Sequence, residues 1–223
     1  MATSRACVIV YVKQPKPGFA KTRLIPALGA DGAAETSRQM AEHCIRRVDR
    51  CNPRITVMIE YASADADHAH EWFDTWLRPF FHSGRAVMFG AQRSGPGVDL
   101  GAKMATSFRK AFNDLHQTHV LVVGTDAPGL CAEKHISAAF HALESEQADL
   151  VIGPAKDGGY YLLGMQELHR NVFEGIQWST STVFCATMEK ARAMALKVML
   201  LEMLPDVDTP DDLDVWRAAA SSA

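Results

Sequence analysis

The stretch DLVIGPAKDGGYYLLGM, residues 149–165, decides the fold class. It places two apolar, strand-like runs on either side of the short turn KDGG, which is typical of an antiparallel hairpin. Other apolar, β-branched runs are continuous, as expected of strands covered on both faces of a mostly parallel sheet. These runs are residues 6–12, 55–59, 86–89, 120–123 and 198–201. The sequence therefore predicts a mixed, mostly parallel sheet with an antiparallel piece late in the chain.

Stretches with helical periodicity separate these strands. They are residues 30–50, 65–77, 99–115, 132–146 and 181–195. Strands that alternate with helices are typical of βαβ units, so we predict an α/β fold in which helices cover both faces of the sheet, a three-layer α/β/α sandwich. Because no repeat, low-complexity tract or Pro/Ser linker marks a second unit, we expect residues 1–223 to form a single domain.

Composition excludes several classes of protein. The net charge is −3, from 23 Lys and Arg against 26 Asp and Glu, so there is no broad basic field to bind nucleic acid or an anionic membrane. The five cysteines are dispersed and form no CxxC pair, which argues against a disulfide framework or a cysteine zinc site and favours a reducing cytoplasm. The first apolar run is too short for a signal peptide core or a membrane span. We expect a soluble, cytoplasmic protein.

The loop KQPKPGFAKTRL, residues 13–24, concentrates positive charge directly after the first predicted strand. In open α/β sheets, ligands bind beyond the carboxyl ends of the strands. Gly18 permits a close backbone approach, and Lys21 and Arg23 have a two-residue spacing that directs both to one side of an extended segment. The loop matches neither GxxxxGK[ST] nor GxGxxG. From this stretch alone, a polyphosphate site and a solvated basic loop are both open interpretations.

Acidic residues occur in two other loops. In VLVVGTDAPGL, Asp126 follows a buried strand, where a carboxylate is costly unless a cation meets it. In LPDVDTPDDLDVW, Asp206 and Asp208 are alternate residues that share one face of an extended segment. Together these carboxylates suit an Mg²⁺ or Mn²⁺ site that also takes substrate phosphates. The alternatives are that Asp126 caps the next helix and that Thr209 and Pro210 simply begin the last one.

The remaining candidates are local patterns with simpler alternatives. The hairpin turn contains Asp157, Gly158 and Gly159, a composition that also suits a plain turn. His68 and His70 in DADHAHE are suited to a metal, but they lie where an acidic helix start is expected. The other histidines form no HExxH motif. No GxSxG elbow is present and no cysteine has a partner near it in sequence, which argues against hydrolysis by a serine or cysteine nucleophile.

Six motifs occur together between about residues 10 and 214, nearly the whole chain. They are KQPKPGFAKTRLIPALG, DLGAKM, VVGTDAPGL, GPAKDGGYYLLG, IQWSTSTV and DVDTPDDL. As a set they resemble the bacterial DUF2064 family, usually described as a glycosyltransferase of radical-SAM/selenodomain and arsenosugar gene sets. That family looks like part of the nucleotide-diphospho-sugar transferase superfamily, which includes guanylyl- and cytidylyltransferases. The resemblance implies a GT-A-like α/β/α sandwich around a mixed sheet.

The resemblance also implies roles for individual residues. Asp126 and Asp208 would bind one Mg²⁺ or Mn²⁺, Lys21 and Arg23 would be catalytic, and Asp157 would face the acceptor or sugar. An inverting glycosyl transfer needs a general base, and Asp157 is our candidate for it. The phosphate-binding residues would be Gly18, Lys21, Arg23 and Lys103. The residues facing the sugar or acceptor would be Gly158, Gly159, Tyr160, Trp178, Ser179 and Thr180. The chain departs from the family pattern in QRSGPGVDLGAKM, which is longer than usual and has Lys103 where arginine is typical, and Asp126 lacks the second acid of a DxD motif.

The function that follows is a metal-dependent transferase. We expect glycosyl transfer from a nucleotide sugar to a small-molecule acceptor, with a divalent ion and the cationic loop stabilising the nucleoside diphosphate that leaves. Nucleotidyl transfer from a nucleoside triphosphate needs the same electrostatics and is the first alternative. A nucleotide-binding module without catalysis is the second. We expect no nucleic acid partner and no membrane span.

Overall fold

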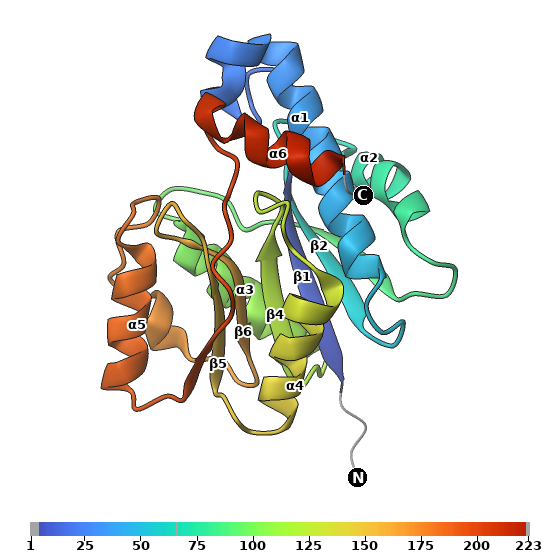
Figure 1. The fold of residues 1–223 in the computed structure, drawn as a ribbon. Helices are drawn as coiled ribbons and strands as arrows, with labels where there is room; N and C mark the ends of the chain where they lie inside the picture. The colour runs from blue at the N-terminus through green and yellow to red at the C-terminus, as the bar shows by residue number, and fades with distance from the viewer. Residues whose placement is uncertain (1–4, 66, 222–223) are drawn as a thin grey trace.

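The seven strands form one mixed sheet in the order β3-β2-β1-β4-β6-β5-β7 (Figure 1). This computed structural model describes residues 5–65 and 67–221. β1, β2, β3 and β4 pair in parallel, β6 runs antiparallel to both β4 and β5, and β7 is parallel to β5. The strands are β1 Ala6–Lys13, β2 Thr56–Ala62, β3 Val87–Ala91, β4 His119–Gly124, β5 Leu150–Pro154, β6 Tyr160–Met165 and β7 Val198–Leu200. The predicted mixed sheet and the hairpin at residues 149–165 are confirmed.

Helices cover both faces of the sheet, which confirms the α/β/α sandwich. They are α1 Ile25–Asp49, α2 Ala69–Leu77, α3 Leu100–Arg109, α4 Ala138–Glu144, α5 Val183–Ala193 and α6 Leu213–Ala220. Alternate residues of β1 serve the two layers: Val8 and Val10 pack with α1, α2 and α4, whereas Cys7 and Ile9 pack with α3 and α5. None of the described helices is long and apolar enough to cross a membrane.

Helix boundaries differ from the predicted ranges in several places. α2 begins only at Ala69 within the range predicted from residue 65, and the range 132–146 opens with a π-helical turn, Ala132–Ser137, before α4. Two further differences concern α1 and α3. α1 begins at Ile25, five residues before the predicted start, with Pro26 in its first turn and a kink at Gly29, where φ is 70° and ψ is 171°. The helix predicted over residues 99–115 ends its α-helical part at Arg109 and continues as a π-helical turn, Lys110–Asp114. Both differences are local changes of backbone hydrogen bonding that a periodicity of about 3.6 residues does not register.

The segment between β7 and α6, residues 201–208, crosses the carboxyl edge of the sheet and is called the C-terminal strap here (Figure 1). Its Leu204 N–H donates to the Pro154 carbonyl at 3.0 Å, and its Val207 N–H donates to the Asp126 carbonyl at 3.0 Å. The Val207 side chain is fully buried against α1 and α6. Because side chains alternate in an extended segment, the residues on either side of Val207 face the opposite way, over the end of the sheet.

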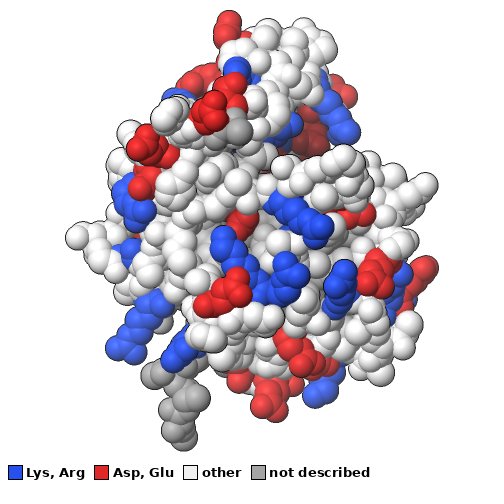
Figure 2. Space-filling view, turned by 180° about the vertical axis from the view of Figure 1, so that it is seen from behind, with Lys and Arg blue, Asp and Glu red and all other residues white. Residues whose placement is uncertain are grey.

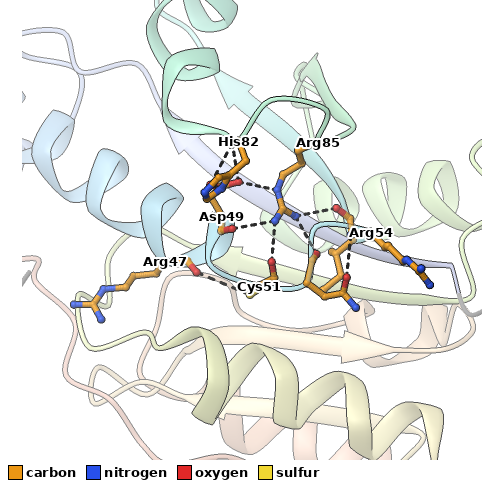
Figure 3. A network of polar contacts seen from close by, with 8 residues as sticks. Arg47, Asp49, Cys51, Arg54, His82 and Arg85 are labelled. Carbon is orange, nitrogen blue, oxygen red and sulfur yellow. Dashed lines mark hydrogen bonds and ion pairs between the residues drawn. The ribbon is translucent and has the colours of Figure 1, made fainter.

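A buried arginine fastens the other end of α1 (Figure 3). The side chain of Arg85 is 1% exposed and donates to Asp49 Oδ1 at 2.7 Å. It also donates to four backbone carbonyls between residues 49 and 55. Asp49 is the last residue of α1 and accepts from the His82 backbone N–H at 3.2 Å as well. The guanidinium therefore ties α1 to the loops that enter β2 and β3.

Candidate functional site

Two adjoining cavities lie at the carboxyl edge of the sheet. The first, of about 430 Å³, is lined mainly by the hairpin turn and residues 178–183, and we call it the hairpin cavity. The second, of about 410 Å³, is lined mainly by the loop after β1 and the start of α3, and we call it the loop cavity. Arg23, Leu100, Asp126 and Asp208 line both. The two cavities therefore meet at a boundary that carries carboxylates.

Lys21 holds that boundary together. Its ammonium donates to the Val207 carbonyl at 2.7 Å and to Asp208 Oδ1 at 2.8 Å, and it also forms an ion pair with Asp126. Its side chain is only 9% exposed. Burial disfavours the charge, but the attraction of Asp126 and then of Asp208 outweighs it and raises the pKa of Lys21. Lys21 is therefore a buried cation shared by the loop after β4 and the C-terminal strap.

Arg23 and Lys103 bring further positive charge to the same place. Arg23 lies 3.5 Å from Asp208 Oδ2, and its side chain is 67% exposed, so it remains available to a ligand. Lys103, on α3, lines the loop cavity together with Lys21. The structure brings all three predicted cations to the loop cavity. Gly18 has a positive φ of 76° and does not line either cavity as described, so it shapes the loop rather than the cavity wall.

Three carboxylates lie close together on the hairpin-cavity side of the site. Asp157, Asp206 and Asp208 each place a carboxylate oxygen within 4.8 Å of the others. Asp206 Oδ1 also accepts the backbone N–H of Asp157 at 3.2 Å. Burial, followed by the charge of Asp157, raises the pKa of Asp206. The spacing of the acids in the sequence grouped Asp206 with Asp126 and Asp208 as a possible metal site, whereas the family resemblance assigned the metal to Asp126 and Asp208 without Asp206.

The hairpin turn fixes the loop at residues 179–184. The Gly159 N–H donates to Asp157 Oδ1 at 2.7 Å, which closes the turn and orients the carboxylate. Gly158 has a φ of 89°, and a Cβ atom there would overlap the Ser181 backbone. Its carbonyl accepts from the Phe184 N–H at 2.8 Å. The turn therefore requires glycine both for its backbone conformation and for close packing.

The aromatic residues of the hairpin cavity present rings rather than polar groups. Tyr160 lines the cavity, but its hydroxyl is buried among groups that include Thr187, and it makes no hydrogen bond in the described part of the chain. Trp178 packs against Gly101 so closely that a Cβ atom there would overlap the indole. Ser179 and Thr180 are exposed and line the same cavity. The wall of the hairpin cavity is therefore aromatic, with the hydroxyl groups of Ser179 and Thr180 beside it.

Two local alternatives raised by the sequence are settled by geometry. Thr209 and Asp212 form a capping box that begins the last helix, as predicted for that stretch, while leaving the Asp208 carboxylate free to meet Lys21. The helical turn after β4 begins after Cys131, so Asp126 is not its cap. Beyond these two, His68 pairs with the neighbouring Glu71, and both side chains are more than 80% exposed, which agrees with a solvated helix start.

The opposite face of the molecule carries a further group of cations. Figure 2 shows Lys and Arg side chains near the middle of the face turned away in Figure 1. A smaller cavity of about 250 Å³ beside α3 is lined by Arg93, Arg109 and Arg170, together with the acids Asp99 and Glu174. Gly101 lines this cavity and Trp178 lines the hairpin cavity, so their contact separates the two.

A family model decides the relationship of the chain to known proteins. Residues 47–180 match the family described as "Uncharacterized protein conserved in bacteria (DUF2064)". The chain belongs to the DUF2064 family. A crystal structure from Desulfovibrio desulfuricans G20, assigned as a nucleotide-diphospho-sugar transferase, is 36% identical to this DUF2064 protein, with a TM-score of 0.84 over 96% of this chain and 87% of the other. The predicted family and superfamily are confirmed.

More distant structures share the fold of this DUF2064 protein. CMP:2-keto-3-deoxy-manno-octonic acid synthetase, solved with CTP, is 10% identical and has a TM-score of 0.56 over 98% of this chain and 99% of its own. Molybdopterin-guanine dinucleotide biosynthesis protein A from Archaeoglobus fulgidus is 15% identical, with a TM-score of 0.53 over 97% and 100%. No curated protein matches by sequence. The fold is thus that of a class of transferases, as predicted.

Proposed function

We propose that this DUF2064 protein is a divalent-metal-dependent glycosyltransferase that moves a sugar from a nucleotide sugar to a small acceptor. The supporting observation is the carboxylate boundary between two unlike cavities. The loop cavity contains lysines and Arg23 and suits the phosphates of a nucleotide, whereas the hairpin cavity contains Trp178 and hydroxyl side chains and suits a sugar and its acceptor. We propose that residues 1–223 work as one domain, since one sheet carries both cavities.

The charge among the clustered carboxylates favours a divalent ion. Asp126, Asp157, Asp206 and Asp208 give four negative charges against the two positive charges of Lys21 and Arg23 that pair with them, a formal balance of −2. A diphosphate oxygen placed against these carboxylates would be repelled unless another cation lay between them. All the candidate donors are carboxylate oxygens, which Mg²⁺ and Mn²⁺ prefer. Asp126 and Asp208 are the proposed ligands, with Asp157 and Asp206 beside them.

Each side chain at the site has its own role in the proposed reaction. When bound, the divalent ion supplies charge stabilisation to the diphosphate leaving group. Arg23 and Lys103 donate to the phosphate oxygens from the loop cavity, and Lys21 joins them as described below. Asp157 is exposed in the hairpin cavity, with Oδ1 held by the Gly159 N–H, so Oδ2 remains to take a proton from the acceptor hydroxyl. General-base catalysis of this kind contributes about 10²- to 10⁴-fold to rate.

Nucleotidyl transfer is the second candidate, and particular observations favour it. Lys13, Lys21, Arg23 and Lys103 all line the loop cavity, enough charge for a triphosphate. The residues two positions before and after Asp126 are Gly124 and Pro128, so Asp126 has no second acid of the DxD type. In this reaction an acceptor phosphate attacks the α-phosphorus of the nucleotide and needs no general base. Asp157 would then bind the acceptor instead of activating it.

A ligand screen separates the candidates. Purified protein with Mn²⁺ is tested by thermal shift against UDP-, GDP- and CMP-sugars and against the common nucleoside triphosphates, because a bound ligand stabilises in proportion to its occupancy. Glycosyl transfer predicts stabilisation by a nucleotide sugar and release of nucleotide without pyrophosphate. Stabilisation by triphosphates alone, with pyrophosphate released, would favour nucleotidyl transfer. Binding that is indifferent to Mn²⁺ and to Asp126→Asn would exclude a metal-dependent enzyme and leave a nucleotide-binding module.

A further inference from the structure

Lys21 occupies the place between Asp126 and Asp208 that the proposed metal site needs. We propose that its ammonium is a resident cation, which a divalent ion must displace and which then moves into the loop cavity to bind phosphate. The inference rests on the proposed metal site and adds an order of events to it. Metal and phosphate would bind cooperatively, because each favours the same displaced position of one lysine.

In its present position, the Lys21 ammonium has no free proton to donate to a phosphate. An ammonium has three protons, and here three acceptors meet it: the Val207 carbonyl at 2.7 Å, Asp208 Oδ1 at 2.8 Å and Asp126. The side chain is 9% exposed. Its present position therefore stabilises the ligand-free site by neutralising two carboxylates, and a phosphate contact requires it to move.

A divalent ion and this ammonium cannot share the same oxygens. Mg²⁺ binds carboxylate oxygens at about 2.0–2.1 Å, closer than the ammonium now lies, and two cations so placed would repel each other strongly. A divalent ion carries twice the charge, and the formal balance of −2 around Lys21 and Arg23 favours the exchange electrostatically. The exchange also removes the ion pairs with Asp126 and Asp208, and leaves the Val207 carbonyl as the contact between the ammonium and the strap.

The backbone of Lys21 shows that its present position carries strain. Lys21 has a φ of 47° and a ψ of 43°, a left-handed conformation that disfavours a residue with a Cβ atom. Gly18, three residues earlier, has a φ of 76° and open space around it, so the loop can adjust there. The lysine side chain is flexible, and Lys21 already lines the loop cavity that it would enter.

Binding of Mn²⁺ alone, measured by electron paramagnetic resonance, tests the displacement. Lys21→Met removes the resident ammonium while keeping an unbranched side chain that is one atom shorter, and we expect it to tighten Mn²⁺ binding about tenfold or more. Arg23→Met removes an equal charge 3.5 Å from Asp208, but this charge is exposed and does not fill the site, so we expect a gain of about threefold or less. Lys16→Met changes the same loop at an ion pair with Asp65 and should leave Mn²⁺ affinity unchanged.

The alternatives give different results. Unchanged or weaker Mn²⁺ binding by Lys21→Met overturns the proposal, and so does an equal gain in Arg23→Met, which would show a general charge effect. If Lys21→Met does not fold, the ¹⁵N resonance of Lys21 Nζ in the unmodified protein decides: we expect it to shift on addition of Mg²⁺ with pyrophosphate, and an unshifted resonance at saturating Mg²⁺ overturns the displacement alone. If neither the unmodified protein nor Lys21→Met binds Mn²⁺, the proposed metal site itself fails.

Discussion

The Nζ atom of Lys21 lies 2.8 Å from Oδ1 of Asp208, a residue 187 positions later in the chain. This contact joins the loop after β1 to the C-terminal strap, which is itself bound to the loop after β4 through Val207 and Asp126. Two features of the strap therefore shape the site. Val207 fixes the position of the strap against the core, and the acids beside Val207 supply the negative charge.

Asp208→Asn tests the charge without disturbing the strap. We expect metal-dependent nucleotide binding to weaken about tenfold or more, because an amide oxygen is a weaker ligand than a carboxylate. The free energy of unfolding should change by less than about 1.5 kcal/mol, since the Asn carbonyl still accepts from Lys21 and the Thr209–Asp212 cap remains. Asp211→Asn, the same change at an exposed residue three positions later, is the control. Equal loss of binding in both variants would contradict a specific role for Asp208.

Gly158→Ala should disconnect the hairpin turn from the loop at residues 179–184. Its Cβ atom would overlap the Ser181 backbone, so the loop and the wall of the hairpin cavity must move. Gly84→Ala is the matched control, because Gly84 has a φ of 90°, against 89° for Gly158, with nothing near its Cβ position. Each change costs about 1–2 kcal/mol of backbone strain, measured by urea unfolding. Only Gly158→Ala should also impair acceptor binding, and equal impairment by Gly84→Ala would refute this account of the turn.

Arg85→Met tests the fastening of α1. The variant removes the cation that pairs with the buried Asp49 carboxylate, which keeps only the His82 N–H as a described backbone donor, and it leaves several carbonyls without their donor. We therefore expect a loss of about 3–5 kcal/mol in the free energy of unfolding. Arg54→Met is the control, because its exposed guanidinium points away from this network (Figure 3). Ligand binding by folded Arg85→Met should be retained, since the network lies at the other end of α1. A loss below about 1 kcal/mol would mean that the network is not needed for stability.

The stability of the fold should fall as the solution is acidified below about pH 6.5, the usual pKa of histidine. Burial lowers the pKa of His43, which contacts the Pro128 carbonyl at 3.0 Å. Below the unfolded pKa, the unfolded chain takes up a proton that the folded chain does not, so stability is full above that pH and is lost as pH falls toward the folded pKa.

His43→Gln should reduce this slope in urea unfolding between about pH 6.5 and pH 5. Some slope will remain, because burial also lowers the pKa of His135. His141→Gln, at an exposed residue of α4, is the control and should leave the slope unchanged. An unchanged slope in His43→Gln would show that His43 is not a source of the acid sensitivity.

The sequence by itself determined the strands, the layers and the loops in which we place the proposed site. Continuous apolar runs such as residues 120–123 are typical of a strand covered on both faces of a sheet. KDGG between two such runs is typical of a tight turn. Local chemistry was therefore sufficient to predict the strands and the hairpin. The alternate spacing of Asp206 and Asp208 likewise predicted a shared face, which the burial of Val207 between them produces. The start of α1 and its kink at Gly29 were missed because they depend on packing around the loop after β1.

Only the tertiary structure decided how the charges meet. Nothing local indicates that Lys21 lies between Asp126 and Asp208, that Asp206 joins Asp157, or that the Tyr160 hydroxyl is buried away from the cavity. Each of these relationships joins segments far apart in the chain, and each depends on the order of strands in the sheet, which brings the ends of β1, β4 and β5 to one edge. Side-chain type fixes which charges are present, whereas the distances between them, which set their interaction energies, arise only when the sheet is assembled.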